Sequence, residues 1–545
     1  MNLDLDFGLY SINLNRIINY LKQDMSDDWF QDPLFFSDRL KQDCIIDYFE
    51  KNINQNSGAY LPNDRILLNI PKPEGTLRYS LETNFFDRFA FHAYGVTIIQ
   101  HFDKMISKRV FSHRLNNRDF DKSNAKYLFY NPIIQWKKFE EYIKIDSLNS
   151  CILISDLQNY YENINIDILR GTLYLLLKKC DASGKEKAKI RFCIDSICSC
   201  LLKWTFNEEH GLPQNRDISS FLANVYMYPI DEEMINQGFD YYRYMDDIRI
   251  ICKDQYEARK ALKILSCELR EIGLTINGKK TSILINGTDE HKEFIEDNGV
   301  ELESLDALLN TKKKQIVAIA FQQIKEEFEK CLEQKDYTSK KFRFLLNRIS
   351  KIALCKDIKK PNTYFNFIKG NIIGAIVTTP SSMYDFFHIL SCIDLTNGDM
   401  NKIYKYLSDE EKAIYSWQNY LLWKLLVMKN YRNRNLLIFA RKQVKSLKTA
   451  NVAGALLYIG KYGNIHDKKD LLTIFNGKKC FFVQRHFLIA VQELERKEIQ
   501  KIEMEILEEN RGVYKYLHEL RAPLYMSLPN EIKYSDIFNQ VGFYV

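Results

Sequence analysis

The sequence lacks the residue patterns that mark several protein classes. No segment reaches the roughly 18 apolar residues of a membrane span. The first ten residues carry acidic and polar groups where a secretory signal needs a basic start and an apolar run. Low-complexity segments and a clean internal repeat are also missing. These absences predict a cytoplasmic protein with no membrane partner.

The cysteines lack the spacing of a zinc site. Twelve of them are spread along the chain without a CxxC pair or a histidine partner at zinc-like spacing. The closest group, Cys193, Cys198 and Cys200, lies in an apolar stretch of helical character, where buried thiols are expected to act as small hydrophobic side chains. The sequence therefore predicts a reducing compartment and no structural metal site.

The chain also has little net charge for its size. Its 545 residues carry a formal charge of +6, with 46% hydrophobic and 27% charged residues. Any attraction to nucleic acid must therefore come from local basic surfaces. Because this length exceeds what one hydrophobic core normally organises, we expect two or three ordered domains.

Three patterns follow one another along the chain. Residues 1–65 place apolar side chains at helical spacing and predict a helical lead-in. Residues 66–285 alternate strand and helix signals, which is typical of an α+β domain. Residues 286–545 predict an all-α domain, and the succession of amphipathic helices in it also fits stacked helix pairs.

The individual elements can be located from periodicity and turn residues. Strands are expected at residues 66–70, 77–81 and 151–154, with a strand pair at 241–252. Helices are expected at residues 87–108, 322–334, 340–355, 413–428, 436–447 and 484–509.

Two adjacent carboxylates interrupt a hydrophobic hairpin. Residues 242–251 read YRYMDDIRII, which places Asp246 and Asp247 at the turn. Like charges at this position repel each other, and divalent cations such as Mg²⁺ would neutralise them. An ordinary Asp-Asp turn is the alternative, because such a string arises by chance in roughly one sequence of this size in ten.

A third carboxylate follows a buried strand. Asp156 comes directly after the apolar run CILIS, and a strand end directs its side chain to a shared site. Asp156 and Asp246 could hold two ions about 4 Å apart, one activating a 3′-hydroxyl and one stabilising the leaving pyrophosphate. Capping of a helix N-terminus by Asp156 is the alternative.

These motifs resemble those of reverse transcriptases. A strand-ending aspartate with an aromatic residue five positions on, followed by YxDD in a hairpin, resembles motifs A and C of that family. Three further motifs appear in the family's order: a fingers motif at residues 70–78 with Asp87 and Arg88, motif B at residues 211–214 with Ser219 and Asn224, and motif D at residues 273–277 with Lys280 and Thr281. The resemblance implies a right-hand polymerase fingers-palm fold for residues 66–285.

The resemblance also implies a metal site. Asp156 and Asp246 would bind two Mg²⁺ ions, or Mn²⁺, together with the main-chain carbonyl of Leu157. Asp247 would be a supporting carboxylate and metal ligand whose direct contact with the ions varies among relatives. All three aspartates would then be catalytic.

Five more residues match nucleotide-binding positions of the family. Lys72 and Arg78 would grip the triphosphate, and solvated hairpin charges are the alternative for both. Tyr161 would be the aromatic steric gate, whose ring favours deoxynucleotides. Gln214 would border the nucleotide and the template, and Lys280 would lie near the leaving phosphate or on the surface.

The sequence departs from the family's motif B at one position. Asn215 stands where related enzymes carry a second glycine, and the charged pair Arg216 and Asp217 follows. Because glycine permits close approach of the backbone, this change suggests an altered path for template or primer.

The order of parts resembles the bacterial defence-associated, abortive-infection reverse transcriptases. A long helical domain follows the polymerase motifs without a nuclease, integrase or maturase segment, and FSHRL at residues 111–115 also fits that group. The resemblance implies an RNA-directed DNA polymerase that uses dNTPs in anti-phage defence and assembles as a homo-oligomer. Synthesis would be templated by a partner non-coding RNA, or untemplated and primed by a protein hydroxyl. A retroelement reverse transcriptase and a decayed RNA-binding assembly module are the alternatives.

Overall fold

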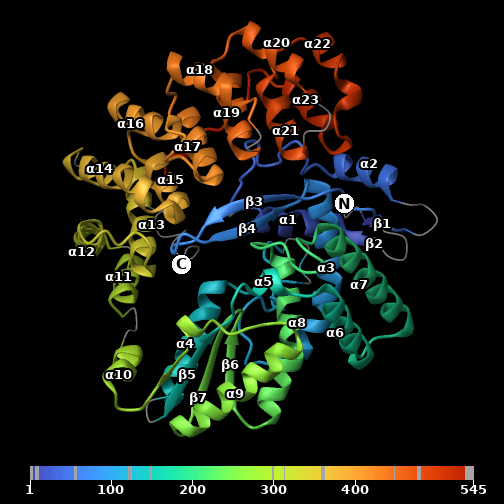
Figure 1. Cartoon of the computed structure of the whole chain (residues 1–545), viewed down its shortest axis with the longest axis vertical. Helices are drawn as coiled ribbons and strands as arrows, with labels where there is room; N and C mark the ends of the chain where they lie inside the picture. The colour runs from blue at the N-terminus through green and yellow to red at the C-terminus, as the bar shows by residue number, and fades with distance from the viewer. Residues whose placement is uncertain are drawn as a thin grey trace. The chain divides into compact units, whose positions relative to one another are not determined.

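The described part of the chain forms two compact units in the computed structural model (Figure 1). The first unit comprises Met1–Gln31, Arg39–Leu67 and Ser80–Asn298, and the second comprises Asp32–Asp38, Leu68–Tyr79 and Gly299–Val545. The predicted domain boundaries at residues 65 and 285 stay a prediction. The described residues are 4–6, 11–26, 28–53, 58–120, 122, 125–147, 150–296, 300–311, 313–357, 362–446, 449–475 and 480–533.

A four-stranded antiparallel sheet forms the centre of the first unit, with its strands in the order β6-β7-β5-β8. The strands are β5 (Cys151–Asp156), β6 (Asp240–Tyr244), β7 (Asp247–Cys252) and β8 (Ser282–Leu284). Their β-branched and aromatic residues favour extended backbone. The predicted strand at residues 151–154 and strand pair at 241–252 are confirmed.

Helices pack on both faces of this sheet. On one face lies α4 (Pro132–Ser147). Its Trp136 ring packs edge-on against the Tyr244 ring, with 4.9 Å between the ring centroids. On the other lie α8 (Asp217–Asn236) and α9 (Gln255–Glu271), and Asp231 of α8 forms an ion pair with Arg243. Arg243 and Tyr244 are neighbours in β6, so their side chains point to opposite faces.

Helix α3 (Phe85–Phe102) is the buried helix of the first unit. Its sequence is apolar on every side, which suits a helix surrounded by others. It packs against α1 (Leu14–Asp24), α7 (Gly184–Trp204) and α8. A Cβ atom at Gly95 would lie 2.4 Å from the Ile218 side chain, so glycine permits the close approach of α3 and α8.

The remaining elements of the first unit are shorter. Within the predicted helical lead-in, a strand pair that the sequence did not predict precedes α1 and α2. These elements are β1 (Asp4–Asp6), β2 (Ser11–Asn13), α2 (Gln42–Asn52), η1 (Asp103–Met105), α5 (Tyr160–Asn163), α6 (Ile166–Lys179), η2 (Gly278–Lys280) and α10 (Asp289–Glu296).

The predicted hairpin of the fingers motif is confirmed as β3 (Ile66–Pro71) and β4 (Leu77–Glu82). Its turn is closed by two backbone hydrogen bonds, from Lys72 N to Thr76 O at 2.8 Å and from Gly75 N to Lys72 O at 3.0 Å. Gly75 has a φ of +81°, which glycine adopts without strain. The turn belongs to the second unit.

After β8, the described residues form helices and no further strand, as predicted. In Figure 1 these helices follow one another from α11 to α23. They are α11 (Val300–Asn310), α12 (Lys314–Glu333), α13 (Lys340–Leu354), α14 (Asn362–Thr378), η3 (Pro380–Ser382), α15 (Met383–Cys392), α16 (Asn397–Ser408), α17 (Ser416–Met428), α18 (Arg434–Gln443), α19 (Thr449–Tyr462), α20 (Ile465–Ile474), α21 (Phe481–Ala490), α22 (Arg496–Gln500), η4 (Glu503–Glu505), η5 (Glu508–Asn510) and α23 (Arg511–His518).

The helices of the second unit stack in rows. One row runs from α13 through α15, α17, α19 and α21 to α23, each packed on the next, and α14, α16 and α18 pack in sequence as a second row. Gly454 of α19 permits the closest of these contacts, because a Cβ atom there would lie 2.5 Å from the Trp423 ring. This arrangement in rows fits the expected stacking of helix pairs.

Two predicted helices end earlier than expected. The helix predicted at residues 87–108 ends at Phe102, where η1 follows. The single helix predicted at 484–509 is wrong, since α21 ends at Ala490 and the rest of that range holds only the short helices α22, η4 and η5. Just beyond the end of α21, the Gln492 side-chain amide donates to Leu524 O at 3.1 Å and accepts from Leu524 N at 2.8 Å. These bonds tie the end of the helix to a distant segment.

Two predictions about composition can be compared with the fold. Cys193, Cys198 and Cys200 are all buried in α7, as expected for packing thiols. Within the ranges that the structure describes, no helix combines the length and the apolar character needed to cross a bilayer.

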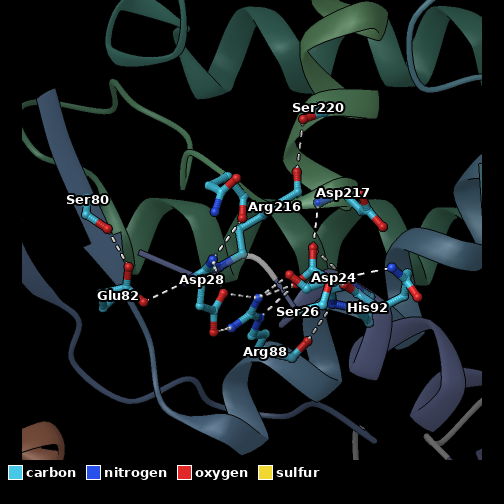
Figure 2. Close-up of polar contacts among 12 residues, drawn as sticks. Asp24, Ser26, Asp28, Ser80, Glu82, Arg88, His92, Arg216, Asp217 and Ser220 are labelled. Carbon is cyan, nitrogen blue, oxygen red and sulfur yellow. Dashed lines mark hydrogen bonds and ion pairs between the residues drawn. The ribbon is translucent and has the colours of Figure 1, made fainter. Parts of the chain in front are cut away.

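A buried group of alternating charges connects five segments of the first unit (Figure 2). This charge cluster consists of Asp24, Asp28, Glu82, Arg88 and Arg216, and each residue is at most 8% exposed. Arg88 binds Asp24 at 2.5 Å and Asp28 at 2.7 Å. Arg216 binds Asp28 at 2.9 Å and Glu82 at 2.6 Å. Each guanidinium thus bridges two carboxylates from different segments.

The cluster also holds the start of α8. Asp24 Oδ1 accepts a hydrogen bond from the backbone N–H of Asp217 at 2.7 Å, in the first turn of that helix. Burial raises the pKa of Asp24, but the charges of Arg88, His92 and Arg216 outweigh it and lower the pKa to about 2. Asp24 therefore stays ionised, and a carboxylate at a helix N-terminus is stabilising.

The substitution Arg216→Met should destabilise the protein, because it leaves Asp28 and Glu82 buried without one of their cations. Breaking a buried ion pair in this way costs about 3 kcal/mol. Chemical denaturation should show this loss in the free energy of unfolding. Arg118→Met, which removes an exposed guanidinium of the same unit, should change it by less than about 0.5 kcal/mol. Equal stability of the two variants would contradict the structural importance of the cluster.

Candidate active site

Three carboxylates lie together at one end of the sheet. Asp156 ends β5 and pairs with Asp247, the first residue of β7, in the antiparallel register. Asp246 precedes Asp247 in the turn from β6, where Met245 has a left-handed φ of +54°. The structure thus brings together the three aspartates that the sequence predicts as the catalytic group.

Repulsion among these carboxylates is visible in the pKa of Asp246. Burial of its side chain, together with the neighbouring charges of Asp247 and Asp156, raises this pKa to about 6. Ionisation of Asp246 is therefore less favourable than that of a free carboxyl group, and a bound cation would offset this. The group offers oxygen donors alone, which Mg²⁺ prefers.

Cations from the chain itself hold two of the aspartates. Lys280 Nζ lies 2.9 Å from Asp156 Oδ2, and Arg249 Nη2 lies 3.3 Å from Asp247 Oδ1. Partial burial lowers the pKa of Lys280, but its hydrogen bond to Asp156 and the nearby carboxylates raise that pKa overall. Throughout the described ranges, no three His, Cys, Asp or Glu side chains are assembled as a metal-binding group.

The segment that carries Lys280 is fastened to the end of β5. Asn277 donates from its backbone N–H to Asp156 O at 2.7 Å and from its side chain to Asp156 Oδ1 at 3.2 Å. Gln158 N donates to Thr275 O at 2.9 Å. The two backbone bonds flank an antiparallel bridge between Leu157 and Ile276. The Leu157 carbonyl, the predicted main-chain ligand, accepts neither of them.

Two adjacent tyrosines in α5 have different surroundings. Tyr160 is buried, and its hydroxyl donates to Ala223 O at 2.5 Å, in line with the expectation that it packs in the core. Tyr161, the predicted steric gate, is partly exposed, and its hydroxyl lies 2.8 Å from Ser220 Oγ of α8. The main-chain carbonyl of Tyr161 accepts from Leu212 N at 2.9 Å. Motif B therefore contacts Tyr161 at two points.

The departure from motif B keeps a glycine-like backbone. Asn215 has a φ of +57°, in the left-handed region that asparagine tolerates better than most residues. Gln214, the predicted nucleotide neighbour, is partly exposed beside it. Asn215 thus has a backbone conformation that glycine adopts easily, and it carries a side chain that glycine lacks.

Lys72 and Arg78 belong to a different unit from the three aspartates. Both lie in the hairpin segment Leu68–Tyr79, which belongs to the second unit. Their predicted grip on the triphosphate stays a prediction.

Sequence reasoning missed a cation beneath the turn. Arg243 is fully buried and forms an ion pair with Asp231 at 2.6 Å. It also donates to Asn224 Oδ1 at 2.8 Å and to Met245 O at 3.0 Å, just before Asp246. An arginine inside a hydrophobic strand was a usable signal, because a buried charge needs partners nearby.

A comparison with protein families identifies the enzyme class. Residues 71–345, just over half of the 545, match the family described as reverse transcriptase (RNA-dependent DNA polymerase). The chain belongs to the reverse transcriptase family. It therefore carries an RNA-directed DNA polymerase domain, which is a nucleotidyltransferase.

Solved structures of two telomerases are similar to this reverse transcriptase. One is telomerase from Candida albicans in complex with a TWJ fragment of telomeric RNA, with 12% identity over 69% of this chain and 67% of that chain and a TM-score of 0.32. The other is telomerase from Candida tropicalis with the same type of fragment, with 13% identity over 71% and 70% and a TM-score of 0.30. No curated protein matches the chain.

Neutralising Asp246 should stabilise the metal-free protein. Asp246→Asn removes the charge that Asp247 and Asp156 repel, so the free energy of unfolding at pH 7.5 in a chelating buffer should rise by about 1 kcal/mol. Asp181→Asn removes an exposed carboxylate of the same unit and should leave stability unchanged. A less stable Asp246→Asn protein would mean that the ionised carboxylate is supported rather than repelled.

Proposed function

We propose that this reverse transcriptase synthesises DNA from dNTPs at the site formed by Asp156, Asp246 and Asp247. The observation that carries this proposal is the pairing of Asp156 with Asp247, with Asp246 in the adjoining turn. That arrangement puts three carboxylates at one strand end, where a primer 3′-hydroxyl and a nucleotide triphosphate can share them. The raised pKa of Asp246 supports it, because functional sites often keep such unfavourable charge.

The site fits a pair of Mg²⁺ ions, with Mn²⁺ as an alternative. Asp156, Asp246 and the Leu157 carbonyl would hold them, with Asp247 in support. Ions bound there would favour ionisation of the 3′-hydroxyl and offset charge on the leaving pyrophosphate. Asp156 would have to release Lys280 first, and 62% exposure of that lysine side chain leaves it room to swing away.

The other side chains would position the nucleotide. Lys280, once released from Asp156, would carry its charge to the leaving phosphate. Lys72 and Arg78 would hold the triphosphate from the β3–β4 hairpin, the lysine as a point charge and the arginine as a planar fork. Gln214 would border the base and the template, and the Tyr161 ring would occupy the space of a ribose 2′-hydroxyl.

We further infer a function in anti-phage defence, in the cytoplasm and as a homo-oligomer. The resemblance to defence-associated reverse transcriptases supports it, as does a helical second unit in the place of nuclease or maturase segments. Synthesis is either templated by a non-coding RNA or untemplated with a protein primer. Sequencing the nucleic acid that co-purifies with the protein, including covalently attached material, separates these two modes. A retroelement enzyme would instead yield products copied from its own element.

Substitution of Asp246 should abolish synthesis. Asp246→Asn should lower the rate of dNTP incorporation in the presence of Mg²⁺ by at least about 100-fold, equivalent to about 3 kcal/mol of transition-state stabilisation. Incorporation of labelled dNTPs by purified protein with its co-purified nucleic acid measures this, and Asp181→Asn is the control. A fully active Asp246→Asn variant rules out the proposed site. Wild-type protein without incorporation, combined with a defence phenotype that survives Asp246→Asn, indicates a decayed assembly module.

The steric-gate assignment can be tested by removing the ring. Tyr161→Ala should raise ribonucleotide incorporation relative to deoxynucleotide incorporation by about 100-fold or more, because the 2′-hydroxyl no longer meets the ring. The ratio of kcat/KM for dNTP over rNTP is the measurement. An unchanged ratio assigns sugar discrimination to another residue.

A further inference from the structure

Tyr161 is tied to helix α8 by a directed pair of hydrogen bonds. Its hydroxyl lies 2.8 Å from Ser220 Oγ, and Ser220 Oγ donates to Arg216 O at 3.1 Å. A serine hydroxyl has one proton and two lone pairs. Because Ser220 gives its proton to Arg216, Tyr161 must donate to Ser220. The bonds therefore run from Tyr161 through Ser220 to the backbone of Arg216.

The receiving end of these bonds is held rigidly. Ser220 lies in the first turn of α8, which Asp24 holds through Asp217 N at 2.7 Å. The Arg216 side chain is anchored to Asp28 and Glu82 in the charge cluster (Figure 2). Displacing Ser220 would disturb these buried ion pairs, which is costly.

The two ends of the Tyr161 residue are thus fixed separately. Its main-chain carbonyl accepts from Leu212 N, and its ring hydroxyl donates to Ser220. A tyrosine side chain turns about two torsions. Rotation about Cβ–Cγ leaves the hydroxyl oxygen in place, whereas rotation about Cα–Cβ swings the whole ring, so a hydrogen bond to that oxygen restrains the position of the ring through the Cα–Cβ torsion. Tyr161 is partly exposed, whereas Tyr160 is buried. Packing therefore restrains the Tyr161 ring less than the Tyr160 ring.

We propose that Ser220 is a specificity-determining residue, which holds the Tyr161 ring in the orientation that excludes a ribose 2′-hydroxyl. The inference rests on the proposed function and adds to it the residue that makes the gate effective. Ser220 is a positioning residue, because it acts through Tyr161. Without the Ser220 hydroxyl, the ring gains orientations that leave room for a ribonucleotide.

The test compares sugar discrimination in a double-mutant cycle of the full chain. Ser220→Ala and Tyr161→Phe each remove one hydroxyl and leave the gate ring in place. Each should lower the ratio of kcat/KM for dNTP over rNTP by roughly three- to tenfold, the factor that one net hydrogen bond represents. The double variant should lower it no further, since both hydroxyls belong to one bond.

Ser219→Ala is the matched control for this cycle. Ser219 is the preceding residue of α8 and fully buried, and its hydroxyl has no hydrogen-bond partner among the described residues. Its removal makes the same chemical change in the same turn of the helix. The ratio of dNTP to rNTP use should stay at the wild-type value in Ser219→Ala, whatever happens to its overall rate.

The outcomes separate this inference from the proposed function. If wild-type protein shows no Asp246-dependent incorporation, the proposed function fails, and the inference with it. Two results with active wild-type protein overturn the role of Ser220 and leave the proposed function standing. In one, Ser220→Ala and Tyr161→Phe keep the wild-type ratio of kcat/KM for dNTP over rNTP. In the other, their effects on that ratio add in the double variant. Should Ser220→Ala not fold, as judged by its melting curve, Tyr161→Phe decides by itself, because its altered ring is partly exposed.

Discussion

The register of β5 against β7 is the constraint on which the site depends. Side chains alternate across a strand, so a shift of one residue would turn Asp156 to the opposite face from Asp247. Apolar pairs fix this register, for example Ile152 opposite Ile251 and Leu153 opposite Ile250, all of them buried. The hydrophobic core thus selects the pairing, and the carboxylates meet at the strand end as a consequence. No favourable contact among the aspartates themselves is needed to bring them together.

Bringing like charges together destabilises the fold, and three cations offset this in different ways. Arg243 is fully buried and bound to Asp231, so it can support the turn but cannot leave it. Arg249 binds Asp247 from within β7 and is mostly covered. Lys280 holds Asp156 from an exposed position. The degree of burial therefore divides the cations into two permanent supports and one exposed counter-ion, which the proposed metal ions would displace.

The sequence predicts features whose partners are close along the chain, and misses those whose partners are distant. The hairpin around Asp246 and the strand that ends at Asp156 follow from local alternation and turn residues. The charge cluster could not be predicted, because Arg216 meets Asp28 and Glu82, which lie 188 and 134 residues away in sequence, and nothing local marks the pairing. The hydrogen bonds that the Gln492 side chain makes with Leu524 after the end of α21 also join residues far apart in sequence, and no local pattern predicts them. Asn215 could be singled out as a departure from the family, but only the structure gives its left-handed φ.

These distant contacts change how the N-terminal segment is understood. By its pattern alone it is a helical lead-in, separate from the polymerase motifs. Helix α8 has no capping side chain of its own, because Arg216 at its N-cap makes no such bond, and Asp24 of the lead-in supplies the missing acceptor. The first turn of α8 carries Ser220, which holds the Tyr161 hydroxyl. The geometry next to the proposed nucleotide site therefore depends on a carboxylate from near the start of the chain, and helix α1, which ends at Asp24, belongs to the same compact unit as motifs A to D.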